Sequence, residues 1–174
     1  MVNKLIGLLL TVFGALLGGL VMLRLRLVWS LLVFGLLQMS SSLAFWWLAV
    51  HGKGQLPGLT IPAFDFGFVK LQHPTLVDGG LLMAVASENL ASGMGTAAFL
   101  AFLMSLTNQR FSATQFALLS AFQSVGRVWI GPLAGVLAEA IGWPSFFLVA
   151  IAMGVPSLVW LKALWKPIDA LDVR

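Results

Sequence analysis

The sequence contains no cysteine and very little charge. Without cysteine, the chain can form neither disulfides nor thiolate metal sites. Charged residues make up only 9% of the 174 positions, whereas 60% are hydrophobic and the mean hydropathy is +1.00. Soluble domains carry roughly 25% charged residues and roughly 45–50% apolar residues. The composition therefore excludes an ordinary soluble protein and predicts an integral membrane protein, with the lipid bilayer as its surroundings.

The few charged residues are mostly basic, with ten Lys and Arg against six Asp and Glu. Nucleic-acid-binding proteins gather such residues into one patch or stripe. Here the basic residues are scattered singly between apolar runs, so we expect no nucleic-acid partner.

Five apolar runs have the length of membrane spans, and their approximate bounds are 5–23, 27–50, 77–106, 112–138 and 143–165. A helix needs about 20 such residues to cross the hydrocarbon core. None of the runs shows the period-two alternation of a membrane β-barrel. The predicted fold class is an all-α integral membrane protein with about five transmembrane helices. A cleaved signal peptide is the alternative for the first run, but no small-x-small cleavage site precedes Arg24, which favours a true span.

The short loops predict how the chain is oriented. One side of the predicted bundle carries most of their basic residues: Arg24, Arg26, Arg110, Lys162, Lys166 and Arg174. The positive-inside rule places this side, and with it the C-terminus, in the cytoplasm. The segment 51–75 is rich in proline and glycine and is predicted to be an external loop rather than a sixth span. Asp78, at the outer end of the third span, is expected to face water or to cap the helix.

Two ionisable residues lie deep in otherwise uncharged runs: Glu88 in the third and Arg127 in the fourth. A charged side chain at the centre of a membrane helix costs about 2.5–3.5 kcal/mol on insertion scales, so such residues usually serve a function. Glu88 is our proton-coupling candidate. Arg127 is either its ion-pair partner or the anchor for an anionic group of a substrate. The alternative is a static ion pair that only specifies helix packing.

Polar residues accompany both ionisable groups at three- and four-residue spacings, which place side chains on one helix face. Besides Arg127, the substrate or ion-pair candidates are Asn89, Ser92, Thr96 and Gln123. Spans two and five are bulky and uncharged, so we expect them to contact mainly lipid. His51 and His73 lack accompanying ligands, and we predict neither a metal site nor a cofactor.

Small residues predict where helices pack closely. Gly14 and Gly18 in the first span, and Gly131 and Gly135 in the fourth, follow the small-xxx-small pattern that lets helix backbones approach one another. We assign these four glycines to helix packing.

The third and fourth spans contain long motifs: Glu88-Asn89, GMGTAAF at 93–99, FSATQFALLSA at 111–121, Gly126-Arg127 and Gly131-Pro132. Together with the stretch from Gly14 to Arg24, these motifs strongly resemble the AmpG-type muropeptide permeases of the major facilitator superfamily. The resemblance implies helices 8–12 of a twelve-helix transporter in the bacterial inner membrane. It also implies proton-driven import of anhydromuropeptides for cell-wall recycling. The implied partners are a muropeptide substrate, protons and a missing N-terminal half of the transporter, because major facilitators bind substrate between two halves.

Two other interpretations stay open. One is a major facilitator permease for another solute, and the other is a non-transporting membrane subunit or a truncated product. An intramembrane enzyme is not expected, because the sequence has no HExxH motif, no phosphate-binding glycine loop and no Ser-His-Asp arrangement.

Overall fold

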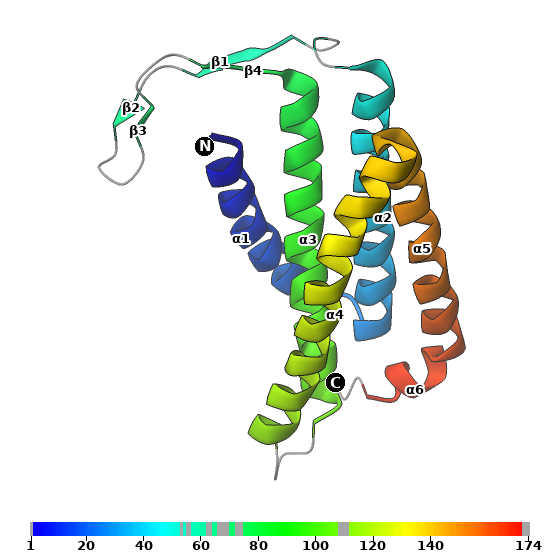
Figure 1. The fold of residues 1–174 in the computed structure, drawn as a ribbon. Helices are drawn as coiled ribbons and strands as arrows, with labels where there is room; N and C mark the ends of the chain where they lie inside the picture. Colours follow the sequence, from blue (N-terminus) through cyan, green and yellow to red (C-terminus); the bar gives the residue numbers. More distant parts are fainter. Residues whose placement is uncertain are drawn as a thin grey trace.

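The computed structural model describes residues 2–52, 54, 57–61, 64–65, 70–71, 75–107 and 112–171. Within these ranges the chain forms five long helices and one short helix (Figure 1). Their bounds are α1 Val2–Met22, α2 Leu27–His51, α3 Gly79–Ser105, α4 Ser112–Ile141, α5 Trp143–Ala163 and α6 Trp165–Asp169. The predicted all-α class is confirmed, and each long helix overlaps one of the five apolar runs.

Three of these helices are long and apolar enough to cross a membrane by length and composition, namely Leu27–His51, Ala113–Ile141 and Trp143–Ala163. Ile6–Met22 forms a shorter apolar helix. Many large apolar side chains on these helices are exposed, among them Leu16, Trp129 and Met153. A surface of this kind is typical of a protein whose solvent is lipid.

The connection between α2 and α3 contains two small antiparallel ladders. Strand β1 (Leu59–Ile61) pairs with β4 (Thr75–Val77), and β2 (Phe64–Asp65) pairs with β3 (Lys70–Leu71). The proline- and glycine-rich sequence predicts an external loop here and gives no sign of these strands. Their pairing depends on contacts between opposite ends of the connection, which its proline- and glycine-rich composition does not reveal.

The two ends of the bundle differ in charge. Figure 1 shows the ladders, the N-terminus and the turn between α4 and α5 at one end, and the turn between α1 and α2 with α6 at the other. The second end carries Arg24, Arg26, Lys162 and Lys166, whereas the basic residues described at the first end are Lys4 and Lys70. Arg110 and Arg174 lie outside the described residues.

Helix α3 packs against both α1 and α2, and α5 packs against the opposite side of α2. Val28 and Phe34 of α2 are consequently buried. The expectation that this span contacts mainly lipid does not extend to the buried face of α2, although Trp29, Leu36 and Val50 on the same helix are exposed. It holds better for α5, in which no residue is buried. Helix α4 crosses the bundle with few contacts and is exposed along most of its length (Figure 1).

Glycines allow the close approach of α1 and α3. A Cβ added at Gly93 would meet the carbonyl oxygen of Thr11 and lie 2.8 Å from the backbone nitrogen of Ala15. At Gly18, an added Cβ would lie 2.9 Å from the Cα of Met94, and at Gly14 it would collide with a backbone carbonyl of α3. The α1–α3 interface therefore requires glycine at these positions.

The glycines of α4 are different. No described atom lies within 4 Å of a Cβ added at Gly131 or Gly135. Their predicted role in helix packing stays a prediction.

Candidate functional site

Glu88 lies on α3 and is bound by two side chains of α2. Its Oε1 accepts a hydrogen bond from Gln38 Nε2 at 2.5 Å, and its Oε2 accepts one from Ser41 Oγ at 2.5 Å. Gln38 and Ser41 are three residues apart and so lie on the same face of α2. The two donors together form a site for a carboxylate.

The hydroxyl of Ser41 has a second acceptor within reach. Its Oγ is 2.8 Å from the backbone carbonyl oxygen of Gln38 and 2.5 Å from Glu88 Oε2. A serine hydroxyl has one proton and can donate to only one of the two oxygens at a time. Ser41 is 4% exposed, so water does not readily replace either acceptor. The hydroxyl can therefore donate to the carboxylate when it is ionised and to the backbone when it is not.

Gln38 can form a hydrogen bond with Glu88 whether the carboxyl group is ionised or protonated. Its amide carries a donor nitrogen and an acceptor oxygen on the same terminal group. The nitrogen donates to the carboxylate oxygen in this structure. After a rotation of the amide, the oxygen would accept from a protonated carboxyl. A change in the charge of Glu88 is thus coupled to the orientation of Gln38.

Gln38 also borders a cavity of about 320 Å³ between α2, α3 and α4. This volume lies within the range of small-molecule sites, roughly 300–1,000 Å³. The polar lining residues are Gln38, Ser92, Thr96 and Gln123, and the others are Leu31, Phe34, Gly35, Gly95 and Phe99. Amide and hydroxyl groups on an apolar wall are the pattern of a site that recognises a polar, uncharged surface. We take this cavity and Glu88 together as the candidate functional site.

Three of the predicted substrate candidates, Ser92, Thr96 and Gln123, meet at this cavity, but Asn89 does not. Asn89 Oδ1 accepts a hydrogen bond from Thr11 Oγ1 at 3.0 Å, and its Nδ2 donates to the carbonyl oxygen of Val85 at 2.7 Å. Asn89 therefore belongs to the contact with α1. One residue corresponds to about 100° of rotation around a helix, which turns Asn89 away from the face of Glu88. The polar stripe that the sequence suggested is divided between two interfaces.

Arg127 lies within α4, but its side chain is outside the described part of the structure. Its pairing with Glu88 stays a prediction. The described partners of Glu88 both come from α2. Within the described residues, no group of three His, Cys, Asp or Glu side chains is placed to hold a metal ion.

The two residues that bind Glu88 are not among the candidates predicted from the sequence. Gln38 and Ser41 belong to the stretch Gln38-Met-Ser-Ser-Ser42, a polar interruption midway along an otherwise apolar run. An uncharged amide or hydroxyl is less costly in a membrane helix than a charge, so this signal is weaker than that of Glu88. Its position opposite an acid of another helix becomes visible only when the two helices are placed together.

Comparison of sequences shows which known proteins this chain is similar to. The chain is 46% identical over 160 residues, 92% of its length, to the anhydromuropeptide permease of Escherichia coli K12 and to that of Escherichia coli O157:H7. It is 33% identical over 163 residues to a Rickettsia conorii protein assigned as a transporter, AmpG 4. No family model matches the chain. The resemblance to AmpG-type permeases seen in the sequence is thereby confirmed.

The match covers only part of each relative. The chain spans 28% of the length of the Escherichia coli permeases and 34% of the Rickettsia conorii protein. The matched part of the Escherichia coli K12 protein is its C-terminal part. With its apolar helices, this similarity identifies the chain as a multi-pass membrane protein similar to transporters.

Proposed function

We propose that this chain supplies the C-terminal helices of a permease that imports anhydromuropeptides across the bacterial inner membrane together with protons. The sequence similarity to two proteins named anhydromuropeptide permease supports this proposal. The observation that carries it is the contact between Glu88, an ionisable group inside the bundle, and Gln38, a residue of the cavity wall.

In the proposed mechanism, Glu88 takes up and releases the transported proton. With Glu88 ionised, Gln38 Nε2 and Ser41 Oγ both donate to it. Protonation removes the charge and adds a donor, so the amide of Gln38 rotates to accept and Ser41 turns to the backbone carbonyl. The group that Gln38 presents to the cavity then changes from acceptor to donor. Substrate binding and proton binding are coupled through this one amide.

The cavity lining suits the chemistry of a muropeptide. A sugar linked to a peptide offers hydroxyl and amide groups, each of which needs both donors and acceptors. Gln38 and Gln123 supply both kinds, and the hydroxyls of Ser92 and Thr96 add more. Arg127 would bind a carboxylate of the peptide part through both of its terminal nitrogens.

Further helices must complete the transport path, because the polar face of α4 is not covered. Gln123 and Ser124 are exposed on this helix. Polar stripes in membrane helices face protein or a water-filled cavity rather than lipid. We propose that the other half of the transporter packs against α4 and closes the cavity, as expected for a site between two repeats. The basic end of the bundle, and with it the C-terminus, would lie in the cytoplasm.

The test is uptake of labelled anhydromuropeptide by bacterial cells that lack their own permease and express the chain in its native polypeptide context. Glu88→Gln keeps the size of the side chain and removes the titratable group, so we expect it to abolish accumulation against a gradient. Glu139→Gln is the matched control, because this acid is exposed on α4 and should transport normally. Membrane insertion of both variants is measured in parallel. Proton-coupled accumulation by Glu88→Gln at the level of the unaltered protein would remove Glu88 from the mechanism.

A second variant tests the role of Arg127. Arg127→Lys keeps the positive charge and loses the planar, two-pronged geometry. We expect uptake to fail if Arg127 binds a substrate carboxylate through two nitrogens. Near-normal uptake would show that only its charge matters.

A further inference from the structure

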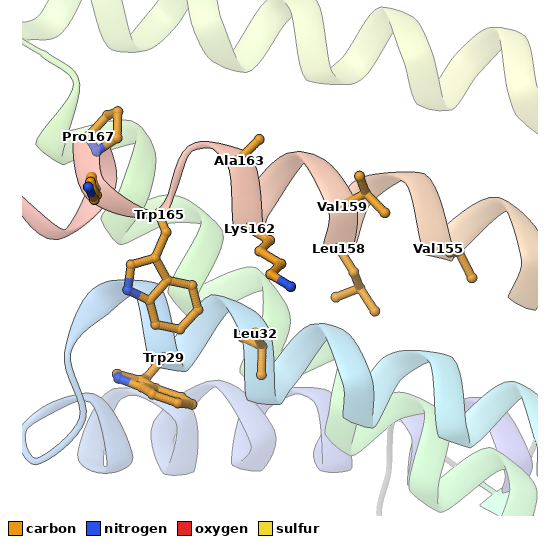
Figure 2. A pocket seen from close by; sticks show the side chains of 10 residues that line it. Trp29, Leu32, Val155, Leu158, Val159, Lys162, Ala163, Trp165 and Pro167 are labelled. Carbon is orange, nitrogen blue, oxygen red and sulfur yellow. The ribbon is translucent and has the colours of Figure 1, made fainter.

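A second and larger cavity, of about 870 Å³, lies on the side of α2 that faces α5 and α6 (Figure 2). Most of its lining is apolar: Trp29, Leu32, Val155, Leu158, Val159, Ala163, Trp165 and Pro167. The two charged residues in the lining are Lys162 and Lys166, both near the basic end of the bundle. The cavity is therefore amphipathic: its positive charge lies at one end and its apolar surface extends along the rest.

The charged end of the cavity includes α6, which is held in place by contacts with the start of α2. Helix α6 is anchored by Ile168, which is 5% exposed and packs with Leu27 and Val28. Arg26 Nη1 forms an ion pair with Asp169 Oδ2 at 3.0 Å. These contacts hold the short helix against the start of α2, and they set the positions of its neighbouring cavity residues.

Some of the basic residues at this end have an acidic partner and others do not. Asp169 compensates Arg26. Among the described residues, neither Lys162 nor Lys166 forms an ion pair. Beside them, the rings of Trp29 and Trp165 meet edge to face, with centroids 4.9 Å apart. Tryptophan is enriched where membrane helices pass through the interface between lipid and water. The mouth of the cavity therefore combines positive charge with the aromatic residues of a membrane interface.

We propose that this cavity binds an anionic phospholipid. The phosphate contacts Lys162 and Lys166, and an acyl chain runs along Leu158 and Val155 toward the middle of the membrane. From Lys162 to Val155 the rise along α5 is about 10 Å, enough to align part of an acyl chain. Basic pockets between transmembrane helices on the cytoplasmic side are a recognised form of headgroup site. Figure 2 shows Lys162 and Trp165 extending from α5 and α6 toward Leu32 and Trp29 of α2.

This inference rests on the proposed membrane location of the chain but not on its substrate. Charge complementarity favours an anionic lipid over a neutral one. A second copy of the chain would place the same basic end against itself in a two-fold contact, where like charges repel.

The test is quenching of tryptophan fluorescence in phosphatidylcholine vesicles that contain the protein in its native polypeptide context. Brominated phosphatidylglycerol and brominated phosphatidylcholine are titrated separately, each upward from a low mole fraction. The signal of the cavity is the difference between the unaltered protein and the double variant Trp29→Phe, Trp165→Phe. We expect the brominated phosphatidylglycerol to quench this signal at a lower mole fraction than the brominated phosphatidylcholine.

Lys162→Gln and Lys166→Gln should each weaken this preference about fivefold. Arg24→Gln is the matched control, because Arg24 is exposed at the same end and does not line the cavity. Equal quenching by the two lipids, a preference that survives in both lysine variants, or no quenching of the cavity signal would each overturn the proposal. Cross-linking of a second copy through the cavity would overturn it as well. The quenching assay measures lipid binding and does not require transport. Its result therefore stands even if the chain does not transport anhydromuropeptides.

Discussion

The side chain of Gln38 touches the carboxylate of Glu88 and also forms part of the cavity wall beside Thr96. An acid inside a membrane bundle is thereby connected to a space large enough for a small ligand. The connection passes through a group that can donate or accept a hydrogen bond.

Gln38→Leu should strongly reduce the uptake of anhydromuropeptide, because it removes one of the two described donors to Glu88. A hydrogen bond to a charged group contributes about 1.5–3 kcal/mol, which corresponds to a loss of roughly 10- to 150-fold. In the background of Glu88→Gln, the same substitution should add little. Initial uptake rates of the two single variants and the double variant measure this coupling. Purely additive losses would show that the two side chains act separately.

Ser41→Ala should slow uptake and change its dependence on external pH, since it removes the second donor to Glu88. The neighbouring Ser40 provides the control. Ser40 is exposed and bonds only the carbonyl oxygen of Leu37 among the described contacts, so Ser40→Ala should transport normally. Uptake as a function of external pH distinguishes the two. Identical pH profiles for both variants would contradict a role of Ser41 in the proton step.

Gly93→Ala should destabilise the packing of α1 on α3. The added methyl group would meet the backbone of α1 at Thr11 and Ala15. Overpacking of this kind typically costs about 1–3 kcal/mol. Gly95→Ala is the control on the same helix, because no described atom lies within 4 Å of a Cβ there. Unfolding of the purified protein by increasing sodium dodecyl sulfate should show a lower midpoint for Gly93→Ala alone. Equal midpoints would show that the two helices do not approach so closely.

Asp78→Ala should loosen the start of α3. The Oδ1 of Asp78 accepts a hydrogen bond from the backbone nitrogen of Leu81 at 2.9 Å, and Oδ2 accepts one from Gly54. Loss of such a cap costs about 0.5–2 kcal/mol. Hydrogen exchange of the amides in the first turn of α3 should accelerate, and Asp78→Asn should retain most of the protection. Unchanged exchange in Asp78→Ala would mean that other contacts fix this helix start.

The helices and some local features could be predicted from sequence because the determining residues are neighbours in the chain. Five apolar runs of the right length led to five helices, and Asp78 was expected to face water or to cap α3, which the hydrogen bond to Leu81 confirms. The partners of Glu88 could not be predicted in the same way. The pattern of Glu88, Asn89 and Ser92 shows that part of α3 faces protein, but it does not say which helix lies opposite.

The position of Gln38 in the fold could not be predicted from the sequence either. Its stretch was assigned to a helix that contacts mainly lipid, whereas the fold places that helix between α3 and α5. Whether a helix contacts lipid or other helices depends on which helix surfaces fit together. At the α1–α3 contact, this fit comes from backbone shape at Gly14 and Gly93 rather than from any polar signal.

The uneven contacts of α3 have a mechanical consequence. On one side, glycines bring its backbone against α1, and this is the most extensive helix contact in the described structure. On the other side, α4 borders the cavity with Gln123 but contacts α3 only sparsely. Helices α1 and α3 should therefore move together as one rigid body, whereas α4 can shift against them with little loss of packing. The cavity then has one stiff wall, formed by α3, and one compliant wall, formed by α4, which can follow the size of its ligand.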